Sequence, residues 1–160
     1  KAALTGHLVL STLHTNDAPS TITRLIDMGL EPFNVAAALN LITAQRLVRR
    51  ICSACREEVT YPAEYLEAAR ITEEQLANLR FFRGRGCDRC GGTGYKGRQG
   101  LYEVMAMSPE IRRLIMQNAS TDELREQALR EGMLTLRMDG LLKVARGVTT
   151  LEEVIKETAA

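Results

Sequence analysis

The chain has 160 residues, of which 45% are hydrophobic, so it can bury the core of one domain or of one domain with a small annex. Its 21 basic and 20 acidic side chains leave a net charge of +1, which argues against a general polyanion-binding surface. No signal peptide opens the chain and no apolar run approaches the length of a membrane span. We therefore expect a cytoplasmic protein without direct membrane insertion. Because Lys1 leads at once into Ala-Ala-Leu-Thr-Gly, we also expect a fragment that begins inside a fold.

The first informative stretch is a short apolar run, Leu8 to Leu10, followed by small and polar residues that include His14. A continuous apolar run of this length predicts a buried parallel strand. Ligands of open α/β sheets bind beyond the carboxyl ends of the strands, so His14 is a candidate contact for a phosphate or a water. The alternative is that Asn16 or Asp17 caps the next helix and the histidine is structural.

Two helices and a strand are expected next. Residues 19–28 predict a helix that stops at Gly29, and a second helix is predicted from Val35 to about Gln45, apolar on most sides. Residues 46–51 mix three arginines with apolar side chains, and we predict a strand there. We expect its arginines to form a solvated face, with contact to nucleotide or to a neighbouring subunit as the alternative.

The four cysteines of the sequence form two Cys-x-x-Cys pairs. They are Cys52, Cys55, Cys87 and Cys90. Each pair places two thiols on one tight turn, and together they supply the four sulfurs of a closed tetrahedral zinc site. Glycines at 91, 92 and 94 suit a backbone that turns around a metal. The alternatives are two disulfides, in any of three connectivities, or four unrelated buried thiols; a catalytic zinc would need an open position that four cysteines do not leave.

The remaining segments are predicted to be mainly helical. The stretch between the cysteine pairs is long enough to need structure of its own, with a helix over 63–69 and a capping box at 72–75. A strand is predicted over 99–105. Further helix signals lie at 108–109, at a capping box over 120–123, over 134–147, and at a capping box over 150–153. We expect this tail to be a compact helical subdomain.

Several motifs together resemble one known family. The string Thr-Gly-His-Leu-Val-Leu-Ser-Thr-Leu-His-Thr-Asn-Asp-Ala, residues 5–18, resembles the histidine box of the bacterial ATPases that drive type II secretion and type IV pilus assembly. The resemblance continues through residues 44–52, both cysteine pairs, residues 91–98 and the Glu103-Val104 step, and so covers nearly the whole chain. The cysteines point to the assembly or secretion branch, because the pilus-retraction branch generally lacks them.

The resemblance implies an α/β fold with three parts. These are the carboxyl-terminal part of a P-loop, RecA-like ATPase core (1–51), a tetracysteine zinc-binding subdomain (52–106) and a helical carboxyl-terminal subdomain (107–160). It also implies a homohexameric bacterial motor in the cytoplasm, held at the inner membrane through the platform protein of a pilus or secretion system.

By the same resemblance, His14 would approach the terminal phosphate of ATP, and His7 is the weaker member of the same box. The full-length parent would bind ATP and Mg²⁺. This chain contains no G-x-x-x-x-G-K-[ST] loop, and the acidic motifs that hold magnesium lie upstream in the family. We therefore expect the chain by itself to be inactive as an ATPase.

Two other functions stay open at this point. A zinc-dependent interaction module, such as the cysteine-rich domain of J-type chaperones, would explain why residues 87–94 fit C-x-x-C-x-G-x-G, although the first pair lacks the glycines. A nucleic-acid-binding zinc module would use the basic and aromatic residues near the second pair, although we do not expect nucleic acid as a partner. Those residues are Arg80, Arg83, Arg85, Arg89, Lys96 and Arg98, with Phe81, Phe82 and Tyr95.

Overall fold

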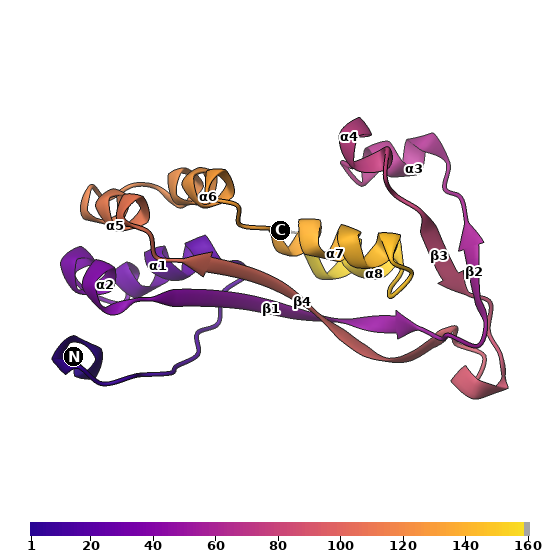
Figure 1. Ribbon diagram of the computed structural model, residues 1–160, viewed down its shortest axis with the longest axis horizontal. Helices are drawn as coiled ribbons and strands as arrows, with labels where there is room; N and C mark the ends of the chain where they lie inside the picture. The colour runs from indigo at the N-terminus through magenta and orange to yellow at the C-terminus, as the bar shows by residue number, and fades with distance from the viewer. Residues whose placement is uncertain (159–160) are drawn as a thin grey trace. The chain divides into compact units, whose positions relative to one another are not determined.

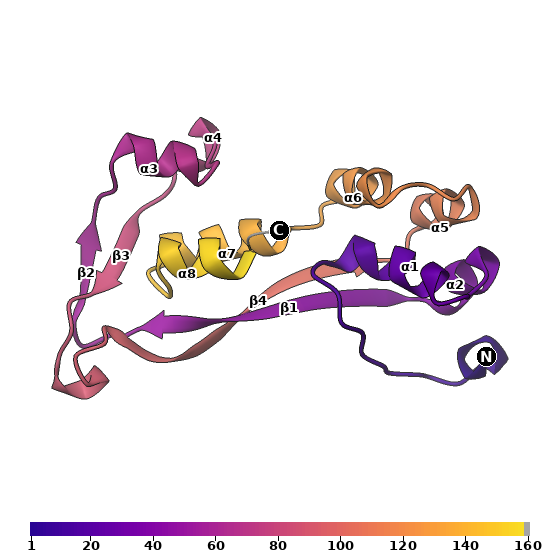
Figure 2. The ribbon, with the colours of Figure 1, turned by 180° about the vertical axis from the view of Figure 1, so that it is seen from behind.

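The computed structural model describes residues 1–158, which form two compact units (Figures 1 and 2). The first unit joins residues 1–45 to 102–135, and the second joins residues 46–101 to the residues from 136 onward. Two long strands, β1 (Leu41–Ile51) and β4 (Tyr95–Ala106), pair with each other, and each contributes residues to both units.

The first unit contains four helices together with residues 41–45 of β1 and residues 102–106 of β4. The helices are α1 (Ala18–Asp27), α2 (Pro32–Ala38), α5 (Pro109–Met116) and α6 (Thr121–Arg130), preceded by a 3₁₀ turn, η1 (Ala2–Thr5). Helix α2 packs on α5, α1 on α6, and α5 on α6. Ile22, Ile111, Ile115 and Leu124 are almost completely buried, so this unit has a hydrophobic core of its own.

The second unit contains an antiparallel hairpin and a pair of packed helices. Its elements are β2 (Arg56–Val59), α3 (Ala63–Ala68), α4 (Glu73–Leu76), β3 (Phe81–Gly84), η2 (Asp88–Cys90), α7 (Leu136–Ala145) and α8 (Leu151–Thr158). A Cβ atom on Gly140 of α7 would lie 2.5 Å from Val154 Cγ1, so this glycine lets α7 approach α8 closely. Val144, Leu151 and Val154 are buried at the contact of the two helices.

Most predicted helix boundaries are confirmed. Asp17 caps α1, and Gly29 lies just past its end with φ +93°. The capping boxes of α4 and α6 are present, and the Ser108 hydroxyl accepts the Ile111 N–H at the start of α5. Strands over 46–51 and 99–105 are confirmed within β1 and β4. The tail helices are divided between the units, α5 and α6 in the first and α7 and α8 in the second; the three-part domain division stays a prediction.

The predicted second helix is too long. Helix α2 ends at Ala38, and residues 41–45 belong to β1. Ile42 and Ala44 are buried while Leu41, Thr43 and Gln45 are exposed, which is the two-residue period of a strand. Pairing with β4 therefore decides a stretch whose apolar composition also suits a helix.

The buried strand predicted over Leu8 to Leu10 is wrong for this structure. Residues 7–15 have no regular secondary structure, and Leu8 and Leu10 are 86% and 87% exposed. A parallel strand forms only by hydrogen bonding to neighbouring strands. None of the strands within residues 1–158 pairs with this segment.

Candidate metal centre and histidine segment

Two strand pairs bring the cysteines together at one end of the second unit. Cys52 follows β1, and its N–H donates to the Gly94 carbonyl oxygen just before β4, at 2.9 Å. Cys55 precedes β2, and its carbonyl accepts the Arg85 N–H just after β3, at 3.0 Å. Because β2 and β3 pair antiparallel, the long stretch between the two cysteine pairs returns to its starting point.

The four sulfur atoms lie within 4.8 Å of one another and could hold one metal ion. The Sγ–Sγ distances are 3.8 Å for Cys52–Cys87 and Cys87–Cys90 and 3.9 Å for Cys55–Cys90. A disulfide would need about 2.05 Å, so these sulfurs are not bonded to one another. Cys52 and Cys55 are buried, and Cys87 and Cys90 are half-buried.

Backbone amides point at the sulfurs from the turns around them. Gly86 donates its N–H to Cys55 Sγ at 3.3 Å, and Cys87 and Gly94 donate theirs to Cys90 Sγ at 3.2 Å. Burial opposes ionisation of Cys90, but these two amides and the hydrogen bonds from the Cys87 and Cys55 thiols together outweigh it and lower the pKa of the thiol to about 6. Burial raises the pKa of Cys55 to about 11, and the neighbouring sulfurs add to that rise. The backbone therefore stabilises negative charge on Cys90 in particular.

Glycines allow the end of β3 to lie directly against the residue that precedes β4. A Cβ atom on Gly84 would collide with the backbone of Gly94, whose amide donates to Cys90 Sγ. Gly91, Gly92 and Gly94 all have positive φ, as the sequence analysis expected of a chain turning around a metal.

The two histidines of the sequence lie on the exposed segment before α1. The His7 ring Nδ1 lies 3.3 Å from both the Ala2 carbonyl and the Thr5 hydroxyl, so this ring turns back onto η1. No hydrogen bond among residues 1–158 involves the His14 side chain, which is exposed. The structure does not bring the two rings to a common partner, and the role predicted for each stays a prediction.

The comparisons with known proteins decide the family. Residues 1–156 match the family model described as Type II/IV secretion system protein. The chain belongs to this secretion family. It is 52% identical over 158 residues to the type IV pilus assembly ATPase PilB of Thermus thermophilus and 49% identical over 164 residues to PilB of Myxococcus xanthus. It is 46% identical over 158 residues to type II secretion system protein E of Pseudomonas aeruginosa.

Each of these matches covers 99% of this chain. The chain in turn spans 18% of the Thermus relative, 28% of the Myxococcus relative and 31% of the Pseudomonas relative. The family resemblance seen in the sequence motifs is thus confirmed. Within residues 1–158, no helix is both long and apolar enough to cross a membrane.

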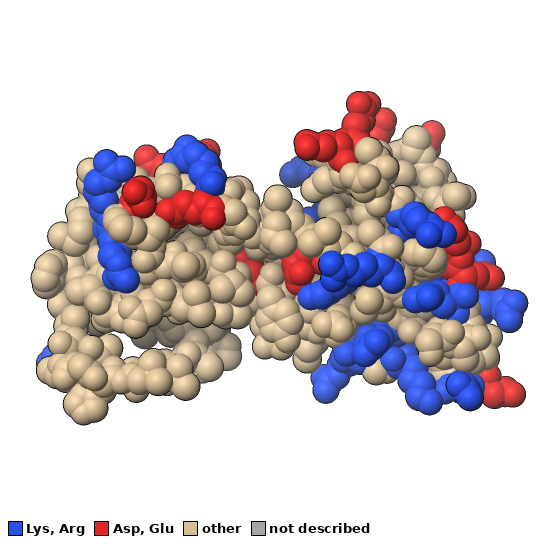
Figure 3. Space-filling model, in the orientation of Figure 1, with Lys and Arg blue, Asp and Glu red and all other residues tan. Residues whose placement is uncertain are grey.

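Basic side chains gather on the second unit of this secretion-family chain (Figure 3). Several that lie near the cysteines in sequence are exposed and form no ion pair among the described residues, including Arg50, Arg85, Arg89, Lys96 and Arg98. Arg80 and Arg83 are instead paired with Glu58 and Glu57 on the hairpin. The aromatic residues nearby are also engaged, because Phe81 is buried and Arg56 and Arg80 both pack on the Phe82 ring.

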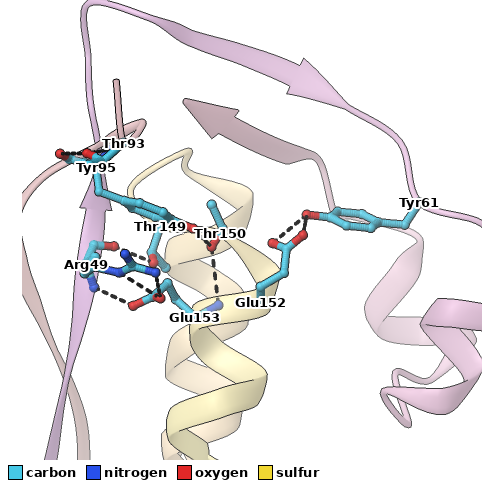
Figure 4. A network of polar contacts seen from close by, with 8 residues as sticks. All are labelled: Arg49, Tyr61, Thr93, Tyr95, Thr149, Thr150, Glu152 and Glu153. Atoms are coloured by element: carbon cyan, nitrogen blue, oxygen red, sulfur yellow. Dashed lines mark hydrogen bonds and ion pairs between the residues drawn. The ribbon is translucent and has the colours of Figure 1, made fainter. Parts of the chain in front are cut away.

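A polar network that the sequence analysis missed joins β1 to the start of α8 (Figure 4). Glu153 is 4% exposed, and its carboxylate accepts hydrogen bonds from the Arg49 backbone N–H at 2.9 Å and from the Arg49 guanidinium at 2.7 and 3.0 Å. The guanidinium also lies 4.1 Å from the centroid of the Tyr95 ring, and the Tyr95 hydroxyl is hydrogen-bonded to that of Thr150 at 2.8 Å. One arginine of the predicted solvated face is therefore a structural residue.

The same network changes the third predicted capping box. The Thr150 hydroxyl accepts the Glu153 N–H at 3.3 Å, as a cap should. The Glu153 carboxylate, however, turns to Arg49 instead of to the Thr150 backbone. Nothing in the local sequence distinguishes these two partners, because Arg49 is about a hundred residues away.

Lowering the pH should weaken this connection. Burial opposes ionisation of Glu153, but the hydrogen bonds from Arg49 outweigh it, so the pKa of Glu153 lies below the ordinary value of 4.5. The stabilisation is fully present above pH 4.5 and is lost as the pH falls through the lower folded-state value. We expect Glu153→Gln to lower the free energy of unfolding by about 1–2 kcal/mol at pH 7 and to flatten its acid dependence. Urea unfolding at pH 7, 5 and 3.5 measures both effects.

Glu157→Gln on the same helix is the matched control, because it removes a carboxylate for which no ion pair is present in the described part of the chain. It should leave the acid dependence of wild type in place. Equal losses for the two variants would contradict a specific role for Glu153.

Proposed function

We propose that this chain is the carboxyl-terminal part of a bacterial ATPase that powers type IV pilus assembly or type II secretion, and that it carries a structural zinc site. The identity over 99% of the chain to proteins named as pilus-assembly ATPases supports the proposal. The observation that carries it is the cluster of four cysteine sulfurs within 4.8 Å, which fits the tetracysteine branch expected from the motifs.

The spacing of the sulfurs fits zinc. In a tetrahedron with Zn–S bonds of about 2.3 Å, neighbouring sulfurs are roughly 3.8 Å apart. The three Sγ–Sγ distances of 3.8, 3.8 and 3.9 Å agree with that value. Cys52, Cys55, Cys87 and Cys90 would hold the ion as four thiolates, and the amides aimed at Cys55 and Cys90 would stabilise their negative charge. Bound zinc would cross-link the ends of β1, β2, β3 and β4; four protein ligands leave no position for a reacting water.

The proposal assigns the catalytic contribution of this chain to the histidine segment. His14 would donate a hydrogen bond to the terminal phosphate of ATP, and His7 would be a weaker member of the same box. The His14 ring is exposed and forms no hydrogen bond among residues 1–158, so it is free to make such a contact. The P-loop and the residues that bind Mg²⁺ would come from the rest of the full-length ATPase.

The working assembly in this proposal is a cytoplasmic homohexamer bound to the platform protein of a pilus or secretion system at the inner membrane. Residues 1–51 would complete a RecA-like core, 52–106 would form the zinc subdomain and 107–160 the helical tail. Support comes from the relatives, whose names place them in pilus assembly and type II secretion.

The exposed cations near the cysteines favour one other candidate, an anion-binding zinc module. Two observations count against a nucleic-acid platform. The aromatic rings that would stack with bases are engaged inside the unit, and a zinc ion with four thiolates carries a charge of about −2 that offsets part of the basic cluster. We therefore rank this function second.

ATP hydrolysis by the chain and by the longer protein tests the proposal. Purified residues 1–160 should bind about one zinc per chain and hydrolyse no ATP above background, because the chain has no phosphate-binding loop. The full-length protein should hydrolyse ATP with Mg²⁺. Micromolar ATP binding by the 160-residue chain, or a full-length protein without ATPase activity, would contradict the proposal.

A further inference from the structure

A buried carboxylate holds the start of the helix that follows the histidine segment. Glu103 on β4 is 3% exposed, and its Oε2 accepts the backbone N–H of Ala18, the first residue of α1, at 2.6 Å. The first amides of a helix have no acceptor within the helix, and the positive end of its dipole attracts a carboxylate. Glutamates are rarely buried unless they are paired, so this contact is a specific connection between residues 85 positions apart.

A second carboxylate holds the same turn from another direction. Asp17 Oδ1 accepts the Ser20 N–H at 2.8 Å, and Asp17 Oδ2 accepts a hydrogen bond from Arg125 on α6 at 2.9 Å. Burial opposes ionisation of Asp17, but the bonds from Ser20 and Arg125 outweigh it and keep the pKa of Asp17 below its ordinary value. Because Pro19 has no N–H, Glu103 and Asp17 between them satisfy all the backbone donors of the first three helical residues.

These contacts hold the point at which the histidine segment joins α1. The hydroxyls of Thr15 and Thr21 add a third connection, at 2.9 Å. His14 is the residue just before Thr15, and residues 7–15 have no regular secondary structure of their own. The direction in which His14 projects therefore depends on the turn from Thr15 to Ala18, which is fixed by β4 and α6.

We propose that Glu103 is a positioning residue for His14, assisted by the Asp17–Arg125 pair. The inference rests on the role proposed for His14 in ATP hydrolysis. Glu103 does not contact the phosphate in this scheme. It holds the first residue of α1, and the chain just before α1 carries His14. A displacement of about 1 Å in a reacting group can cost on the order of 100-fold in rate, so loss of the anchor should affect turnover.

The first test measures the anchor in this chain without ATP. In Glu103→Ala, the Ala18 amide should exchange with solvent about 10-fold faster or more, because its acceptor is lost. The amide of Ile115 in the core of α5 should keep its protection. Glu126→Ala removes an exposed glutamate from α6 and is the matched control, with no expected change at Ala18. Unchanged exchange of Ala18 in Glu103→Ala, or equal acceleration at Ile115, overturns the inference.

The second test is a double-mutant cycle in the full-length ATPase. Glu103→Ala should lower kcat by about 10-fold with little change in KM for ATP, and it should cause no further loss when His14 is already alanine. Glu103→Gln keeps an oxygen acceptor and should restore most of kcat. Additive losses from Glu103→Ala and His14→Ala would show that Glu103 does not act through His14. If Ala18 exchanges faster as expected but His14→Ala has no effect, the function proposed for His14 is wrong and Glu103 is only a structural contact.

Discussion

Cys87→Ser should abolish tight zinc binding by this chain. Serine removes the sulfur that lies 3.8 Å from both Cys52 Sγ and Cys90 Sγ, so the ligand set becomes incomplete. Loss of an outer-shell partner alone typically weakens metal binding by about 10- to 100-fold, and loss of a direct ligand should exceed that. Elemental analysis of protein purified without added metal should show about one zinc per wild-type chain and well under one per variant chain.

The structural consequence should be confined to the second unit. Structural zinc contributes directly to folding free energy, so residues 52–90 should become accessible to thiol reagents and to amide exchange. Ile22 and Ile111 lie in the separate core of the first unit, and their amides should keep their protection. Asp88→Asn, between two of the cysteines, is the matched control and should retain zinc. Full zinc content in Cys87→Ser, or disulfides in place of metal in the wild-type chain, would refute the four-thiolate site.

His14→Ala in the full-length ATPase should reduce the turnover number by on the order of 10- to 1000-fold. A positioned imidazole that donates a hydrogen bond to the terminal phosphate gains strength as negative charge redistributes during phosphoryl transfer. The substitution should leave zinc content and folding unchanged, because His14 is exposed and outside the hydrogen bonds of residues 1–158. Steady-state ATPase kinetics together with elemental analysis measure both.

His7→Ala is the internal comparison. Seven residues separate the two histidines, or roughly 23 Å if the segment were fully extended, so both rings cannot contact one phosphate unless the chain curls back. The His7 ring instead contacts η1, so its removal should cost far less turnover. If His14→Ala kept full ATPase activity and full pilus or secretion function, the histidine would be structural.

The sequence by itself determined the features that depend on neighbouring residues. The Ser120 capping box, the Gly29 stop and the Cys-x-x-Cys spacing all act within a few residues, so their structures could be predicted locally. The motifs also identified the family, which the comparisons confirm.

Only the tertiary structure decided the features that join distant residues. Residues 41–45 have the composition of a helix but are a strand, because β4 offers them a partner. The run from Leu8 to Leu10 has the composition of a buried strand but is exposed, because no strand within residues 1–158 pairs with it. Glu153 and Glu103 look like ordinary helix and strand residues, yet each is buried against a distant partner, 104 positions away for Glu153 and 85 for Glu103. Hydrogen bonds and pairing across such separations depend on how the chain folds back, and local propensity carries no information about that.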